Sequence, residues 1–315
     1  YTYDYFTYSN RDFGAASNVG GRVQTDRDFT FSTNINNVST YKTSFGDHNV
    51  SVDGIFEALK FRYNPLSAQT TGFLPNVFVH NGGTVYESIS GYTTDESLVS
   101  ILGRLSYNYQ NKYFLEGSFR RDGSSRFAQD VRWGNFYSVG GAWVVSKEKF
   151  LENSSVISNL RFKWSYGELG NNRTFYVGGT KNGEVNYFPY ILGYETGWNN
   201  LDQTGVLLGG VVDPNLTWES MKQTDIGLDF TLFNHFNVNF DVYKKLSDNF
   251  LFQYPLPDYL TGGSSWNGGI DSPYFNMGQV ENRGFDLTMS YGTKNDEGFN
   301  WNSTMVMSHN QNKLL

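Results

Sequence analysis

The sequence predicts an all-β fold, a transmembrane antiparallel up-and-down β-barrel. Three features of the 315 residues predict it. Apolar and polar residues alternate within many segments, the links between these segments are alternately short and long, and aromatic residues gather beside the short links. Residue-by-residue alternation places successive side chains on opposite faces of a strand.

The clearest alternating segment predicts which side of the barrel wall each residue faces. Leu160, Phe162 and Trp164 fall on one face, and Arg161 and Lys163 fall on the other. A face with Arg and Lys must meet water, because burying an unpaired charge is costly. We expect the apolar side chains to face lipid and the cations to face the lumen, because a charge on the lipid face costs about 2–4 kcal/mol near the midplane.

The links differ at the two ends of the expected sheet. Some are turns of about three residues, whereas two loops reach roughly 31 and 54 residues, far beyond ordinary hairpin loops. Outer-membrane barrels have short periplasmic turns and long extracellular loops. We therefore expect turns 110–112 and 234–235 at the periplasmic rim, and loops 168–221 and 248–278 at the cell surface. The expected strands lie near residues 1–9, 28–44, 48–63, 98–109, 113–121, 135–146, 158–167, 222–232, 236–247, 279–291 and 299–312.

Aromatic side chains mark the end of the sheet that carries the short turns. Tyr109 and Tyr113 flank one turn, and Phe233 and Phe236 flank another. Amphipathic rings prefer the headgroup level of a bilayer, so this girdle predicts a membrane interface. The alternative is that aromatic residues simply favour strands, but their placement at the strand ends favours the girdle.

The composition is compatible with a barrel and disfavours other classes. The mean hydropathy is −0.48, and no run reaches the roughly 18 consecutive apolar residues of a membrane helix. Strands that expose only every second residue to lipid give no such run. A net charge of −7 without a Lys/Arg cluster disfavours nucleic acid as a partner. The absence of cysteine excludes a disulfide framework.

The sequence offers no catalytic, metal or cofactor site. The usual metal-binding, phosphate-binding and nucleophile-elbow motifs are absent. Asp225 and Asp229 share the polar face of one expected strand, but the strand rise separates them by about 13 Å, beyond the roughly 5–9.5 Å of paired glycosidase carboxylates. Asp229 could approach Asp241 across the next hairpin. A wet, charged lumen accounts for these carboxylates better than catalysis, so we expect no enzyme.

Two long loops, 168–221 and 248–278, contain the candidate substrate-binding residues. Ring faces stack on sugar rings or peptide planes, and the neighbouring Asn, Asp and Gln side chains supply polar contacts. The alternative is that the rings pack the loops against one another. The candidates are Tyr187, Tyr190, Tyr194, Trp198, Tyr259, Trp266 and Tyr274.

We expect residues 1–315 to form one partial outer-membrane barrel domain with long extracellular loops. The expected strands are odd in number, whereas bacterial single-chain barrels have an even number. Open edges within lipid would leave backbone groups without hydrogen-bond partners. The chain is therefore expected to be part of a larger barrel.

Five stretches, in the same order along the chain, resemble the SusC/RagA family of TonB-linked (TonB-dependent) outer-membrane transporters. The resemblance covers roughly residues 98–312 and is faint before them. One such motif alone would be weak, but five collinear motifs are specific. They include Arg120–Phe127, Trp133–Val139, Ser165–Asn171, Pro214–Asp229 and Asn276–Asp286.

The resemblance implies the C-terminal part, about half, of a 22-stranded barrel in the bacterial outer membrane, crossed many times by strands. It also implies an N-terminal plug, coupling to the TonB complex and a SusD-like surface lipoprotein as partner. Such transporters import oligosaccharides or peptides. The plug and the segment that contacts TonB are not among these residues, so energy coupling cannot be located on them. The plugged lumen of 22-stranded transporters agrees with this size class.

Other functions remain open at this point. A TonB-dependent siderophore or vitamin receptor is the nearest alternative within the transporter class. A passive porin would share the strands and loops without a plug. A secreted β-rich protein that binds or cleaves glycans would be soluble without detergent.

Overall fold

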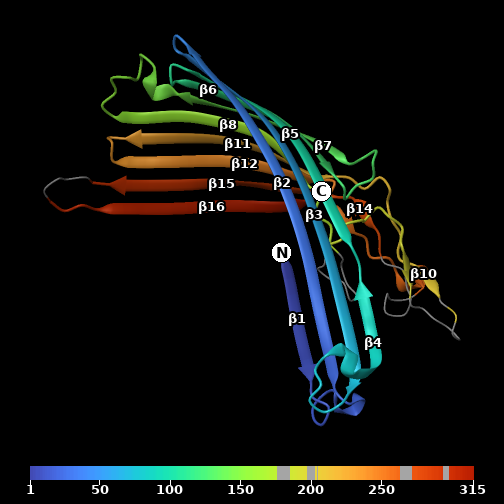
Figure 1. Cartoon of the computed structure of the whole chain (residues 1–315). Coiled ribbons are helices and arrows are strands. Elements are labelled where there is room, and N and C mark those ends of the chain that lie inside the picture. The colour runs from blue at the N-terminus through green and yellow to red at the C-terminus, as the bar shows by residue number, and fades with distance from the viewer. Residues whose placement is uncertain (176–184, 197–202, 204, 263–271, 294–297) are drawn as a thin grey trace. The chain divides into compact units, whose positions relative to one another are not determined.

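The computed structural model describes residues 1–175, 185–196, 203, 205–262, 272–293 and 298–315. The chain forms two compact units (Figure 1). The first unit comprises Tyr1–Ile35 and Ala58–Leu98, and the second comprises Asn36–Glu57 and Val99–Leu315. Strands β2 (Arg22–Phe45), β3 (His48–Phe73) and β5 (Thr94–Tyr109) contribute residues to both units.

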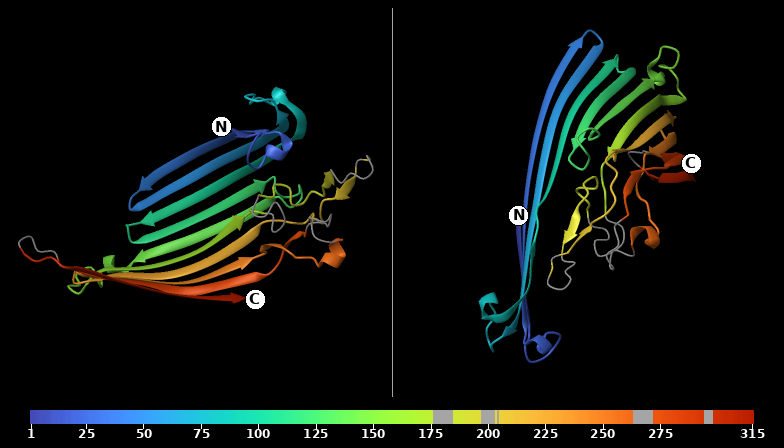
Figure 2. Two further views of the ribbon diagram at one scale, coloured as in Figure 1. Left: turned by 90° about the horizontal axis from the view of Figure 1, so that it is seen from below. Right: turned by 90° about the vertical axis from the view of Figure 1, so that its right-hand side faces the viewer.

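The second unit is an antiparallel sheet in which neighbouring strands follow one another along the chain. Its order is β2-β3-β5-β6-β7-β8-β11-β12-β15-β16, and Figure 2 shows these strands side by side. This up-and-down order confirms the predicted fold class. The remaining bounds are β6 Tyr113–Ser124, β7 Trp133–Val144, β8 Ile157–Asn171, β11 Glu219–Leu232, β12 Phe236–Asp248, β15 Gln279–Gly292 and β16 Asn302–Leu314.

The first unit is built on the ends of β2 and β3. Strand β1 (Thr2–Ser9) pairs with β2, and β4 (Gly83–Gly91) pairs with β3. The alternation pattern predicts that the third strand ends near residue 63 and that a loop follows it. In the structure β3 continues to Phe73 and turns back into β4, with a register shift between Gln69 and Thr70.

The short connections are tight turns with left-handed backbone. The β5–β6 turn has Gln110 and Asn111 at φ 53° and 52°, and the β11–β12 turn has Phe233 and Asn234 at φ 51° and 60°. Two successive positive φ angles define the type I′ turn, which matches the twist of antiparallel strands. The second turn contains Asn234 and His235, as predicted, and its positive-φ pair begins at Phe233, a conformation that bulky residues rarely adopt.

The long loops carry small elements of their own. Strand β9 (Tyr194–Thr196) pairs with β10 (Val206–Leu208), and β13 (Leu251–Gln253) pairs with β14 (Tyr274–Asn276). Strands β10 and β14 lie at the end of the second unit's sheet opposite the short turns (Figure 1). The helical elements are η1 Ser17–Val19, η2 His80–Gly82, η3 Val145–Lys147 and α1 Asp258–Thr261. In the described part of the chain, no helix is long and apolar enough to span a bilayer.

Candidate functional site

One face of the second unit's sheet, here the inner face, carries a network of ion pairs. Lys163 Nζ lies 2.9 Å from Asp229 Oδ1 and 3.0 Å from Asp241 Oδ1. Arg161 Nη2 lies 2.8 Å from Asp229 Oδ2. Gly227 lies opposite both Lys163 and Asp241, and a β-carbon there would clash with both. The sequence allows Asp229 to approach Asp241 across the hairpin. In the structure Lys163 lies between these two carboxylates.

The opposite, outer face is apolar and ends in charges. Trp164 pairs with Ile226, which pairs with Val242, so three strands contribute to one apolar row. Two residues beyond Val242, toward the long-loop end, Lys244 Nζ lies 2.9 Å from Glu281 Oε2. An outward-facing apolar band is typical of a lipid-facing wall. The separation of apolar and cationic residues along β8 is as predicted, and lipid contact remains a prediction.

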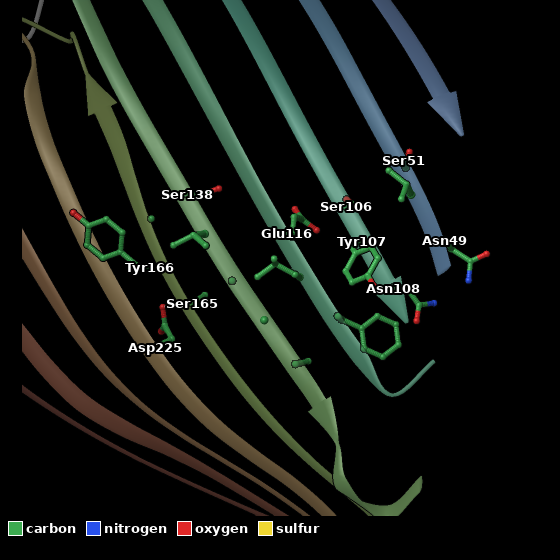
Figure 3. Close-up of a pocket in the computed structure, with 18 of the residues that line it drawn as sticks. Asn49, Ser51, Ser106, Tyr107, Asn108, Glu116, Ser138, Ser165, Tyr166 and Asp225 are labelled. Atoms are coloured by element: carbon green, nitrogen blue, oxygen red, sulfur yellow. Dashed lines mark hydrogen bonds between the residues drawn. The ribbon is translucent and has the colours of Figure 1, made fainter. Parts of the chain in front are cut away.

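The sheet also contains a hollow of about 790 Å³ with both polar and apolar residues in its lining. Five consecutive strands each contribute a polar residue to its lining, and Figure 3 shows these residues along the hollow. Most are small hydroxyl residues that leave room for water and offer hydrogen bonds to a polar solute. The five are Ser106, Glu116, Ser138, Ser165 and Asp225.

Aromatic residues form a continuous row at the short-turn end. The ring centroids of His48 and Tyr109 are 4.6 Å apart, those of Tyr109 and Tyr113 are 6.2 Å apart, and those of Tyr113 and Trp143 are 6.4 Å apart. The row crosses strands β3, β5, β6 and β7. This arrangement agrees with the predicted girdle, because amphipathic rings gather at the interface of a barrel with the membrane.

Glu148, in the connection between β7 and β8, fixes two rings of this row. Its Oε1 accepts hydrogen bonds from Tyr113 Oη at 2.6 Å and from Trp143 Nε1 at 3.1 Å. Lys112 Nζ lies 3.5 Å from its other oxygen. The hydrogen bond from Tyr113, and next the one from Trp143, hold the pKa of Glu148 below its usual range. Glu148 therefore stays ionised at the rim.

The bases of the long loops are joined by a buried aromatic cluster. Phe127 and Leu216 are fully buried. The Trp218 ring centroid lies 5.5 Å from that of Phe127 and 5.6 Å from that of Phe136. A β-carbon at Gly170 would overlap the Phe136 ring, so this strand position needs a glycine. The cluster thus packs residues from β7, the β6–β7 loop and the base of the β8–β11 loop together.

Hydrogen bonds complete this anchor. Trp218 Nε1 donates to the carbonyl of Arg132 at 2.8 Å, and Thr217 Oγ1 donates to the carbonyl of Val131 at 2.8 Å. The Asn276 side chain accepts from the Thr217 N–H at 2.7 Å and donates to the Thr217 carbonyl at 2.9 Å. The Asn276 amide therefore connects the β12–β15 loop to the other two.

These anchor residues were not predicted as functional. They lie in the stretches that carry the family resemblance, where Trp and Phe alternate with Gly outside a clean strand pattern. That composition was the available signal, because apolar rings among small residues are typical of tight packing.

Two candidate loop residues meet in one hollow. Tyr194 and Tyr274 line a space of about 400 Å³ together with Phe188, Ile191 and Val211. The side chain of Tyr194 is 72% exposed, whereas that of Tyr274 is 6% exposed. The hollow lies between the described parts of the two longest loops, and its apolar walls suit a partly apolar ligand.

Tyr274 also packs the loops. Its Oη accepts the backbone N–H of Phe175 at 2.9 Å, and burial raises its pKa. The polar end of a buried tyrosine normally finds such a partner. Tyr274 therefore links the β12–β15 loop to the start of the β8–β11 loop and forms one wall of the hollow.

The other candidates are not brought together. The guanidinium carbon of Arg126 lies 5.2 Å from the Tyr187 ring centroid. Tyr190 is half-buried, and Tyr259, in α1, is 83% exposed. Trp198 and Trp266 lie outside the described residues. The described residues contain no group of three or more His, Cys, Asp or Glu that could hold a metal ion.

A family model described as TonB dependent receptor-like, beta-barrel matches residues 1–312. The chain belongs to this family. The TonB-dependent receptor P3 of Formosa agariphila is 32% identical over 314 residues, which are 96% of this chain and 29% of the relative. The TonB-dependent receptor SusC of Bacteroides thetaiotaomicron is 28% identical over 229 residues, 71% of this chain and 21% of the relative.

Solved structures share the fold of this receptor barrel. The RagAB peptide transporter superposes with a TM-score of 0.79 at 23% identity, covering 93% of this chain and 31% of the other. The outer membrane transporter YddB from Escherichia coli gives a TM-score of 0.52 at 12% identity, covering 94% and 34%. The chain thus spans about a third or less of its relatives. The predicted family and outer-membrane location are confirmed, and the chain is part of a receptor barrel.

Proposed function

We propose that this chain forms part of the barrel wall of a transporter that imports oligosaccharides or peptides through the outer membrane. The whole protein would draw energy from the TonB complex through regions outside this chain. It would act as the barrel subunit of a SusCD-like complex, with a SusD-like surface lipoprotein as partner. No catalytic role is proposed.

The observation that carries this proposal is the anchored loop hollow at one end of a polar inner wall. Tyr194 is exposed beside this hollow, while the Trp218 cluster holds the loop bases in place. A binding loop on a rigid base loses less conformational freedom when it captures a ligand. The polar residues of the inner face then offer a wet surface along which a large polar cargo could pass.

The seven candidate rings divide by exposure under this proposal. Tyr194 and Tyr259 are the described rings most available for stacking on cargo or on the lipoprotein. Tyr187, Tyr190 and Tyr274 would shape and support the loops, and Trp198 and Trp266 are further candidates for cargo contact. Of the similar proteins, RagAB is a peptide transporter, which supports peptides as one cargo class, and P3 and SusC are TonB-dependent receptors.

Uptake by intact cells tests the proposal. Cells with the full-length receptor should take up labelled oligosaccharides or peptides too large for porins. Uptake should stop when either the receptor or TonB is deleted. Uptake that persists without TonB would indicate a passive porin. Exclusive uptake of a ferric siderophore or a vitamin would indicate the nearest alternative receptor class.

A further inference from the structure

A row of side chains crosses the first unit on one face of strands β1 to β4. Tyr5 on β1 pairs in register with Asp26 on β2. Ser67 Oγ on β3 donates to Asp26 Oδ1 at 2.5 Å, and Ser67 pairs with Ser90 on β4. Directly opposite residues of antiparallel strands share a face, so these four side chains project on one side.

A second row lies beside the first. Tyr3 pairs with Asp28 on the neighbouring strand. Pro65 and Tyr92 are two residues from Ser67 and Ser90 along the chain and continue this row at β3 and the end of β4. Members of both rows line a hollow of about 460 Å³ that lies entirely within the first unit. The side-by-side strands that form it are visible in Figure 1.

Two of the three tyrosines in the hollow, Tyr3 and Tyr5, are parallel and partly open to solvent. The rings of Tyr3 and Tyr5 have centroids 6.5 Å apart and planes only 7° from parallel. Both side chains are about half exposed, and Tyr92, across the hollow, is also exposed. Flat rings presented in this way offer apolar surface to the C–H face of a sugar ring while keeping their hydroxyls in water.

The polar groups between the rings are carboxylates held in place. Asp26 accepts from Ser67 Oγ at one oxygen and from Gln24 Nε2, 2.9 Å away, at the other. Asp28 lies next to it on the same face. The described residues that line the hollow include these two carboxylates and no Lys or Arg. Ionised carboxylates accept hydrogen bonds from hydroxyl donors and repel anions.

We propose that this hollow binds an uncharged, hydroxyl-rich ligand, namely a neutral oligosaccharide. Its sugar rings stack on Tyr3, Tyr5 and Tyr92, and its hydroxyls donate to Asp26 and Asp28. The inference rests on the proposed import function and selects the carbohydrate class of cargo. It places recognition on the first unit, away from the residues chosen from the long loops.

A glycan array with the purified full-length receptor tests this inference. The array carries neutral glucose, mannose, xylose and galactose oligosaccharides, oligogalacturonates as anionic controls, and peptides. Wild-type receptor should retain at least one neutral oligosaccharide and not its anionic counterpart. A Tyr3→Ala/Tyr5→Ala variant should bind the retained glycan about tenfold more weakly than the wild type, because two stacking contacts are lost. Asp28→Asn should weaken binding by a smaller factor.

Tyr86→Ala is the matched control. Tyr86 is an exposed tyrosine of β4 that pairs with Thr70 beyond the register shift, on the opposite face from Ser90. This variant should bind like wild type, and all variants should show the same heat-modified gel mobility. A wild-type receptor that retains no neutral glycan, or equal binding by the Tyr3/Tyr5 variant, overturns the inference. TonB-dependent uptake of peptides alone would leave the import function standing while this site falls.

Discussion

Lys163 on β8 reaches Asp241 on β12 across the strand between them, with their charged atoms 3.0 Å apart. The contact is possible because Gly227, on that intervening strand, has no side chain. Partly exposed ion pairs of this kind contribute little to stability, about 0–1 kcal/mol. These ion pairs instead make the inner face of the sheet charged, while the outer face of the same strands is apolar.

The first prediction contrasts two neighbouring positions of β8. Phe162→Arg should impair assembly in the outer membrane, because an arginine on the lipid face costs about 2–4 kcal/mol near the midplane. Lys163→Gln, on the other face, should assemble normally. Heat-modified gel mobility of outer-membrane fractions measures the folded barrel. Normal assembly of Phe162→Arg together with failure of Lys163→Gln would reverse the assigned faces.

The loop anchor gives a second prediction. Trp218→Ala should destabilise the cluster by about 3–5 kcal/mol, because a large buried ring is replaced by a cavity. Backbone amide exchange should accelerate in residues 125–132 and 272–276, which the anchor joins, while the sheet stays protected. Trp301→Ala, at an exposed tryptophan near the short-turn end, is the matched control. Unchanged exchange in Trp218→Ala would show that the cluster does not hold the loops.

The sequence predicted the strands because alternation is local, but it could not predict these cross-strand contacts. Lys163 meets Asp241 only because register places Gly227 between them. Trp218 meets Phe136 only after three loops return to the same end of the sheet. The sequence also predicted the turn between β11 and β12 but not its backbone, since a phenylalanine at positive φ, as Phe233 adopts, is disfavoured locally and is imposed by the pairing of β11 with β12.

Strand β4 was missed for a related reason. The segment around Gly83 and Gly91 reads as turn-rich, and a register shift near Thr70 interrupts the alternation against β3. The sequence could not show which of the candidate ligand-binding residues are exposed and which are buried. Tyr194 and Tyr274 occur in similar aromatic, glycine-rich contexts, yet one is exposed and the other is buried.

The third prediction concerns pH. The folded-state pKa of Glu148 is lowered, chiefly by the hydrogen bond from Tyr113. Its stabilising contribution is therefore present above the unfolded-state pKa and is lost as the pH falls through the folded-state value. Glu148→Gln should lower the thermal midpoint at neutral pH, and the difference from wild type should shrink on acidification. A difference that is constant between pH 7 and pH 3 would exclude this linkage.

The fourth prediction separates cargo contact from loop packing. Tyr194→Ala should leave barrel stability unchanged and weaken cargo binding by a factor of about five, as expected for one lost stacking contact of about 1 kcal/mol. Tyr274→Ala should instead lower thermal stability, because its side chain is buried and its Oη holds the Phe175 N–H. Binding calorimetry and thermal unfolding of the full-length receptor measure the two effects. Identical behaviour of the two variants would contradict the division.

Cysteine labelling of intact cells tests most directly that the long-loop end faces outward and the short-turn end faces the periplasm. This chain contains no cysteine, so a cysteine placed at Tyr259, in the β12–β15 loop, or at Asn111, in the β5–β6 turn, is the only one within it, and the unmodified receptor is the labelling control. A membrane-impermeant maleimide should label Tyr259→Cys in intact cells and Asn111→Cys only after the outer membrane is opened. Labelling of Asn111→Cys, but not of Tyr259→Cys, in intact cells would contradict the topology on which the transport account depends.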